Sequence, residues 1–156
     1  MKLGFASDHR GYKLKNELIS KFQDTYEIED YGTYTEESTD YPDFAFKLGE
    51  NVVVKNVDFG IAICGSGIGI SIACNKVKGV RCAKVDSIEE AIATRNDNDS
   101  NVIAFGEKMD VEKAYNIVKT FITTPASNEE KHVRRRNKMK EYEEHRIWHL
   151  SLFYIL

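Results

Sequence analysis

The chain has 156 residues, the usual size of one domain, and a formal net charge of −3, which gives no general reason to expect a nucleic acid or an anionic membrane as partner. Its 42% hydrophobic and 30% charged residues are typical of a soluble globular protein. The first apolar stretch stops at Asp8, too short for a signal peptide or a membrane span, and the three cysteines form no CxxC pair and no recognisable zinc site. We therefore expect a cytoplasmic protein with a single domain over residues 1–156.

Short apolar runs alternate with helical patterns along the chain. Strands are predicted at 2–6, 27–32, 58–64, 80–85 and 101–106. Helices are predicted at 12–22, 42–54, 68–77, 87–96, 111–122 and 128–146, with Pro42 in the first turn of the second helix. This alternation predicts an α/β fold: a doubly wound, Rossmann-like parallel sheet of five strands in a three-layer αβα sandwich, followed by a C-terminal helix.

In such sheets, ligands bind outside the carboxyl ends of the strands. Asp8 and His9 follow the first predicted strand, and residues 64–69 follow the third. Residues 96–98 come just before the fifth. We therefore expect these three segments to lie near one another.

The glycine-rich turn CGSGIG, at 64–69, predicts a site for an anion or for an oxygen that becomes anionic. Such a turn exposes backbone N–H groups at a helix amino terminus, where negative charge is favoured. The alternative is a tight turn in which the glycines serve only backbone freedom. A dinucleotide site is disfavoured, because residue 70 is isoleucine where the fingerprint needs glycine and because the fingerprint usually follows the first strand.

Cys64 is the candidate catalytic base. A thiol in front of a helix amino terminus ionises more readily than a free one, and a base poised near the working pH can abstract a proton next to a carbonyl. Ser66 and the N–H groups of the turn would then face the enediolate oxygen as charge develops on it. The alternative, a small buried hydrophobic residue, is accepted for Cys74 and Cys82, which have no glycine turn beside them.

The remaining charged candidates lie at the first strand and in the C-terminal helix. Asp8 either orients a sugar hydroxyl or caps the helix at 12–22, and His9 is placed to meet a phosphate. Lys131 and Arg135 are four residues apart, so they share one helix face, as a phosphate clamp requires. The apolar ending WHLSLFYIL (148–156) is expected to pack on the body or on a second subunit.

The stretches SDHRG, TDYPDFA, ICGSGIGISIACNKVKGVRCA and NDNDSNVIAFG, in this order, resemble the ribose-5-phosphate isomerase B family, which also contains the galactose-6-phosphate isomerase subunits. The resemblance covers residues 2 to about 143. It implies interconversion of ribose 5-phosphate and ribulose 5-phosphate through a cis-enediol(ate), as in the pentose phosphate pathway, with no metal and no cofactor. It also implies a homodimer or a dimer of dimers with shared active sites, in which residues 127–156 pack on the partner.

The resemblance also assigns residues. Cys64 matches the base of the family's cysteine-bearing branch, since the other branch has a glutamate where this chain has Ile70. Lys131 replaces an arginine, which keeps the charge but loses the planar fork. Ser66 and the turn around it match the loop that holds the enediolate. The positions that match substrate-binding residues are Asp8, His9, Gly65, Gly67, Ile68, Gly69, Asn98, Lys108, Lys131 and Arg135.

One departure concerns Asp97, which takes the place of the family's ring-opening histidine. A carboxyl group is ionised at neutral pH and donates protons poorly there unless burial perturbs it. Three hypotheses follow: Asp97 opens the ring itself, the enzyme acts only on open-chain sugar, or the substrate is another sugar phosphate such as a galactose or allose 6-phosphate. A catalytically silent sugar-phosphate binder is a further alternative, although it would have no need of Cys64.

Overall fold

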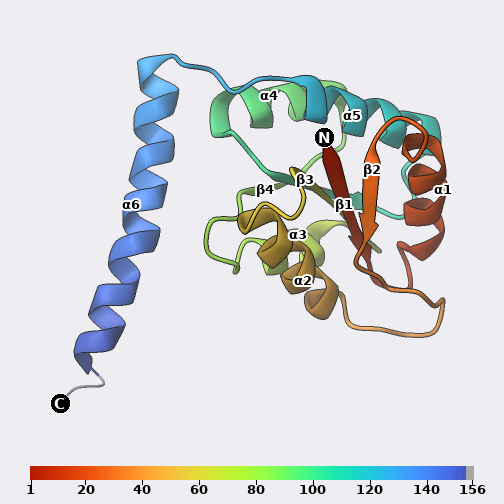
Figure 1. The fold of residues 1–156 in the computed structure, drawn as a ribbon, viewed down its shortest axis with the longest axis horizontal. Coiled ribbons are helices and arrows are strands. Elements are labelled where there is room, and N and C mark those ends of the chain that lie inside the picture. The colour runs from red at the N-terminus through yellow and green to blue at the C-terminus, as the bar shows by residue number, and fades with distance from the viewer. Residues whose placement is uncertain (154–156) are drawn as a thin grey trace.

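The computed structural model describes the backbone of residues 1–153 and side-chain surroundings through residue 145. The strands are β1 (Lys2–Ser7), β2 (Glu27–Asp30), β3 (Phe59–Cys64), β4 (Cys82–Lys84) and β5 (Val102–Gly106). The helices are α1 (Tyr12–Phe22), α2 (Tyr41–Val53), α3 (Ile68–Cys74), α4 (Ile88–Asn98), α5 (Val111–Thr123) and α6 (Glu130–Phe153). The strands form one parallel sheet in the order β2-β1-β3-β5-β4, which confirms the predicted doubly wound fold (Figure 1).

Two hydrophobic cores fill the sandwich, one on each face of the sheet. Helices α1, α4 and α5 cover one face, and α2 and α3 cover the other (Figure 1). Successive side chains of a strand point to opposite faces, so Ile61 and Ile63 of β3 enter the first core, whereas Ala62 and Cys64 enter the second. Cys64 therefore ends the middle strand of the sheet on the side of α2 and α3.

Three elements differ most from their predicted bounds, and the others differ by at most two residues at an end. Helix α3 ends at Cys74, and not at 77, because the Asn75 side chain turns to the backbone of Cys82: its Nδ2 donates to the Cys82 carbonyl at 2.8 Å and its Oδ1 accepts from the Cys82 N–H at 2.8 Å. Strand β4 is shorter than 80–85 and lies at the edge of the sheet. Helix α6 runs to Phe153, beyond the predicted end at 146.

Helix α6 stands beside the rest of the molecule (Figure 1). It meets α4 near its start, and farther along Glu143 Oε1 accepts a hydrogen bond from the Gly79 N–H at 3.0 Å. Between these points lies a groove of about 1110 Å³, lined by α6, the end of α4 and the segment from Asn75 to Ala83. The side chains of the apolar ending at 148–156 lie outside the described residues, so its predicted packing stays a prediction. None of the helices, as far as the chain is described, is long and apolar enough to cross a membrane.

Candidate functional site

The glycine turn places the Cys64 thiol within reach of the backbone N–H of Gly67. Cys64 is 4% exposed, and the N–H of Gly67 donates to its Sγ at 3.2 Å. Gly67 has φ of +77°, a left-handed conformation that favours glycine. Ser66 lies at the surface of the turn, where its Oγ accepts from the Ile68 N–H at 3.1 Å. The predicted turn after a buried strand is thus confirmed, with a sulfur inside it and a hydroxyl at its rim.

Asp8 and His9 follow the neighbouring strand β1, so they lie at the same carboxyl end of the sheet as Cys64. The N–H of Asp8 donates to the carbonyl of Ile63, the residue before Cys64, at 3.3 Å. The buried Asp8 carboxylate accepts the Gly11 N–H at 3.0 Å, so it helps to fix the start of α1, the alternative role that the sequence left open. These contacts hold the loop after β1 against the end of β3.

A third loop fixes the orientation of His9. The His9 N–H donates to Thr39 Oγ1 at 3.0 Å, and the ring Nδ1 accepts the Thr39 N–H at 3.1 Å. Because Nδ1 is engaged in this way, Nε2 is the ring nitrogen left for a ligand. Thr39 belongs to the TDYPD stretch, which sequence reasoning used only to place the start of α2.

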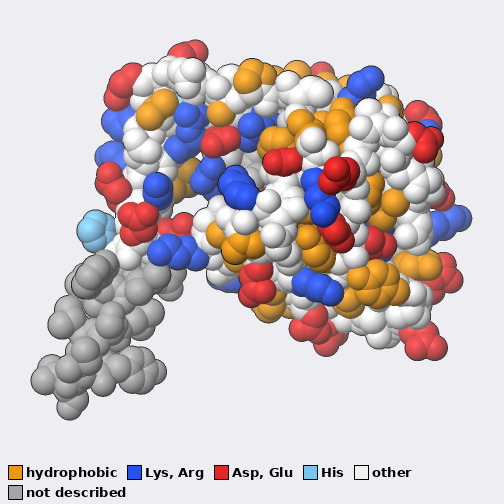
Figure 2. All heavy atoms as spheres, viewed as in Figure 1, with side chains coloured by type: hydrophobic (Ala, Val, Ile, Leu, Met, Phe, Trp, Pro, Cys, Tyr) orange, Lys and Arg blue, Asp and Glu red, His pale blue; other side chains and the backbone are white. Residues whose placement is uncertain are grey.

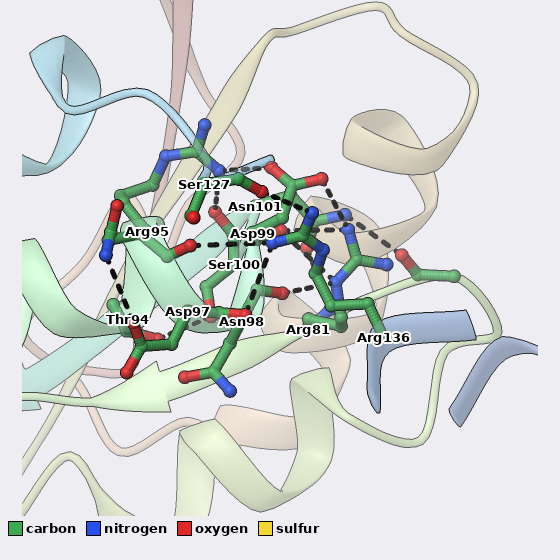
Figure 3. Close-up of polar contacts among 12 residues, drawn as sticks. Arg81, Thr94, Arg95, Asp97, Asn98, Asp99, Ser100, Asn101, Ser127 and Arg136 are labelled. Atoms are coloured by element: carbon green, nitrogen blue, oxygen red, sulfur yellow. Dashed lines mark hydrogen bonds and ion pairs between the residues drawn. The ribbon is translucent and has the colours of Figure 1, made fainter. Parts of the chain in front are cut away.

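Within a single chain, the prediction that residues 96–98 lie beside the glycine turn is wrong. These residues end α4 and come before β5, so they lie at the amino end of the parallel sheet, whereas Cys64 ends β3 at the carboxyl end. Figure 3 shows Asp97 and Asn98 within a polar network around the α4–β5 turn. Asp97 Oδ1 lies 3.5 Å from Nε2 of His132, a histidine of α6 that sequence reasoning missed.

Three arginines hold this end of α4. Arg81 Nε donates to the Asn98 carbonyl at 3.0 Å, and Arg95 NH1 donates to the Ser100 carbonyl at 2.8 Å. From α6, Arg136 NH1 donates to the Asp97 carbonyl at 3.3 Å and NH2 to the Ser127 carbonyl at 2.7 Å (Figure 3). Cations are favourable at the carboxyl end of a helix, where the unpaired carbonyls carry partial negative charge.

The two predicted phosphate-binding cations lie near Asp97 and Asn98, away from the glycine turn. Lys131 and Arg135 lie in the first turns of α6 and are both exposed, and their four-residue spacing in this helix puts them on one face, as predicted. Lys131 Nζ contacts Glu129 Oε2 at 3.2 Å. Figure 2 shows basic side chains gathered on this side of the molecule, over α4 and the start of α6. The predicted site residues thus form two groups, one at each end of the sheet.

The turn after β5 completes the first group. Lys108, a predicted substrate-binding residue, is exposed in this turn. The N–H of Glu107 donates to the Cys64 carbonyl at 2.9 Å, and the Glu107 carboxylate pairs with Arg10. Sequence reasoning missed this pair, because its two residues are 97 positions apart. The first group therefore lies at the carboxyl ends of the three neighbouring strands β1, β3 and β5.

This fold and the residues at the carboxyl end of its sheet define a class of α/β enzymes. The middle strand ends in a cysteine at a glycine-rich turn, and a histidine follows the neighbouring strand β1. The sequence matches the family described as Ribose/Galactose Isomerase over residues 3–139. It is 41% identical to ribose-5-phosphate isomerase B of Escherichia coli over 109 residues, which cover 69% of this chain and 73% of that protein.

Solved structures agree with the sequence match. The structure of ribose-5-phosphate isomerase B from Clostridium thermocellum superposes with a TM-score of 0.88 at 42% identity, covering 92% of this chain and 98% of that one. The enzyme of the same name from Mycoplasma genitalium, with bound ribulose-5-phosphate, superposes with a TM-score of 0.84 at 34% identity, covering 92% and 96%. The chain belongs to the ribose/galactose isomerase family, and it is an isomerase.

Proposed function

We propose that this isomerase interconverts ribose 5-phosphate and ribulose 5-phosphate, with Cys64 as the base. The observation that carries the proposal is the Cys64 sulfur at the end of β3, which accepts a hydrogen bond from the Gly67 N–H of the glycine turn at 3.2 Å. The Mycoplasma genitalium relative with bound ribulose-5-phosphate supports the choice of a pentose phosphate.

The proposed cycle moves one proton between two neighbouring carbons. The Cys64 thiolate takes the proton from C2 of the open-chain aldose, the C2–H electrons form the C1–C2 double bond, and the carbonyl electrons move to O1. Ser66 and the turn amides stabilise the resulting enediolate. The thiol then returns the proton to C1 while the O2 proton moves to O1 and the O2 electrons form the C2 carbonyl, which gives the ketose and restores the thiolate. Asp8 is proposed to orient a sugar hydroxyl.

The phosphate requires the second group of residues, and therefore a second chain. We assign Lys131, Arg135 and His9 to the phosphate, yet Lys131 and Arg135 lie at the opposite end of the sheet from Cys64. A homodimer with two shared sites joins the groups, because each chain then supplies both halves. Exposed Ile68 and Ile72, both 55% exposed on α3 next to the turn, support an interface there.

Turnover of the two pentose phosphates tests the base. Wild type is expected to convert both, Cys64→Ala neither, and the control Cys82→Ala both, since Cys82 lies outside the turn. Activity of Cys64→Ala on both sugars would overturn the assignment. If wild type binds the pentose phosphates without turnover, a galactose or allose 6-phosphate is tested next, and absence of turnover there identifies a silent binder.

Mixing two inactive variants tests the shared site. Cys64→Ala and Arg135→Ala remove residues from different groups, so a mixed dimer keeps one intact site if each site draws on both chains. After subunit exchange of an equal mixture, about a quarter of wild-type activity is expected, because half of the dimers are mixed and each has one working site. No recovered activity in an exchanged mixture would place both groups in one chain's site, against the proposed dimer.

A further inference from the structure

Thr39 contacts His9 through two hydrogen bonds that run in opposite directions. The backbone N–H of His9 donates to Thr39 Oγ1 at 3.0 Å, and the Thr39 N–H donates to Nδ1 of the His9 ring at 3.1 Å. The first bond uses the side chain of Thr39 and the second uses its backbone. Together they join the loop after β1 to the loop before α2, across 30 positions of the sequence.

The loop before α2 is itself fixed against the glycine turn. Helix α2 begins at Tyr41, two residues after Thr39. The Tyr41 ring packs on the turn, since a methyl group on Gly69 would lie 2.7 Å from its Cζ atom. The segment from Thr39 to Tyr41 therefore contacts His9 at one end and the glycine turn at the other. It sets the position of the imidazole relative to that turn.

The hydrogen bond to Nδ1 decides which ring nitrogen carries the hydrogen. A neutral imidazole has one N–H, so an Nδ1 that accepts the Thr39 N–H leaves the hydrogen on Nε2. In the opposite tautomer, Nδ1–H would donate to the Thr39 carbonyl oxygen, 3.2 Å away. The N–H of the half-buried Thr39 would then lose its acceptor, and the described residues provide no other. An unpaired N–H is costly away from water, which favours the Nε2–H tautomer.

Nε2 is the nitrogen that a ligand can reach. It has no hydrogen-bond partner within the described part of the chain, and it is not among the buried unpaired atoms there. The Glu107 carboxylate, near enough to His9 for their charges to interact, is paired with Arg10. Lys108, in the same turn as Glu107, adds an exposed cation. An N–H donor beside cations favours an anionic ligand such as a phosphate.

We propose that Thr39 is a positioning residue of the isomerase: it holds His9 so that Nε2–H, and not a lone pair, donates to the phosphate of the substrate. The proposal rests on the proposed function in one respect, that His9 contacts the phosphate. The Thr39 hydroxyl fixes the backbone of His9, and the Thr39 N–H fixes the ring. Thr39 acts only through His9, so its effect must disappear when the imidazole is absent.

A double-mutant cycle in the full-length protein tests this dependence. Thr39→Val removes the hydroxyl and is expected to raise KM for ribose 5-phosphate about two- to tenfold, with kcat little changed. The Kd of inorganic phosphate should rise by the same factor. His9→Ala is expected to raise both quantities about tenfold or more, and Thr39→Val should add nothing in the His9→Ala background. Thr39→Ser, which keeps the hydroxyl, should restore the wild-type values.

Thr35→Val is the matched control. Thr35 lies in the same loop, and its Oγ1 accepts the Glu37 N–H at 3.1 Å, a bond that does not involve His9. The control is expected to leave KM and the phosphate Kd unchanged. If Thr39→Val has the same effect with and without the imidazole, or if both valine variants have equal effects, the proposal is overturned.

The tautomer is measured directly, without ligand or turnover, by nitrogen NMR of isotope-labelled protein at about pH 8.5, where a free imidazole is neutral. The His9 signals are those lost in His9→Ala. We expect hydrogen on Nε2 and a scalar coupling between the Thr39 N–H and Nδ1, and hydrogen on Nδ1 would overturn the proposal. If His9→Ala leaves phosphate binding unchanged, the phosphate role of His9 in the proposed function is wrong, and the NMR result still decides whether Thr39 orients the ring.

Discussion

Alanine substitutions of the three glycines in CGSGIG should separate backbone strain from simple crowding. At Gly67, a Cβ would lie 2.6 Å from the Phe105 carbonyl carbon, well inside the 3.4 Å at which ordinary contacts begin. That atom belongs to the backbone of β5, which cannot rotate away, and φ of +77° adds left-handed strain of about 1–2 kcal/mol. With about 1–3 kcal/mol for overpacking, Gly67→Ala is expected to lose about 3 kcal/mol of unfolding free energy.

For a chain of this length, a loss of that size lowers the melting temperature by about 6–12 °C. The assay is calorimetry at one protein concentration, because the proposed dimer would make the melting temperature depend on concentration. Gly65→Ala is the matched control for stability: its Cβ would meet only the Arg10 side chain at 3.6 Å. Gly69→Ala should fall between them, since the clash at 2.7 Å is with the movable ring of Tyr41. Equal melting temperatures for Gly67→Ala and Gly65→Ala would refute the reasoning.

Lys15→Met is expected to lose about 3–5 kcal/mol of unfolding free energy, because the fully buried Lys15 pairs with Asp30 and donates to the Thr33 carbonyl at 2.9 Å. The measurement is a urea titration, in which the control Lys13→Met, at an exposed position, should change the unfolding free energy little. Burial lowers the pKa of Lys15, so the folded chain holds fewer protons than the unfolded chain just below pH 10.5. Wild-type stability should therefore gain from rising pH in that window relative to Lys15→Met, and a constant difference would contradict this. Asp97→Asn should lower kcat/KM about a hundredfold if Asp97 opens the ring. The loss should be equal for ribose 5-phosphate and ribulose 5-phosphate, because the equilibrium constant fixes the ratio of the two kcat/KM values. Unchanged kcat/KM values in Asp97→Asn would exclude ring opening by Asp97.

The fold and the first half of the site were predictable because their signals are local. The buried strand before Cys64, the glycines after it and the apolar alternation each lie within a few residues. The early end of α3 was not predictable in this way, because it depends on the Asn75 side chain bonding to the backbone of Cys82. The pair of Arg10 and Glu107 is likewise visible only once the ends of β1 and β5 are placed on either side of β3.

The misplacement of residues 96–98 has a different cause. Parallel strands put every segment that precedes a strand at the amino end of the sheet and every segment that follows one at the carboxyl end. Nearness to a strand in sequence was therefore not enough, and the predicted parallel sheet already implied that Asp97 and Cys64 lie at opposite ends. This separation is the reason why we propose that a second chain supplies one of the two groups.

The two groups of site residues are held by different physical means, which fits a site assembled from two chains. Cys64 and His9 are fixed by strand ends and by short backbone contacts within one edge of the sheet. Asp97, Lys131 and Arg135 lie on helices, and the junction of those helices is fixed by arginines that satisfy the unpaired carbonyls at the end of α4. Arg136 matters most here, because it is the arginine that joins α6 to α4. A rigid α4–α6 junction can present its cations to a neighbouring chain without first ordering a loop. Association would therefore lose little conformational entropy.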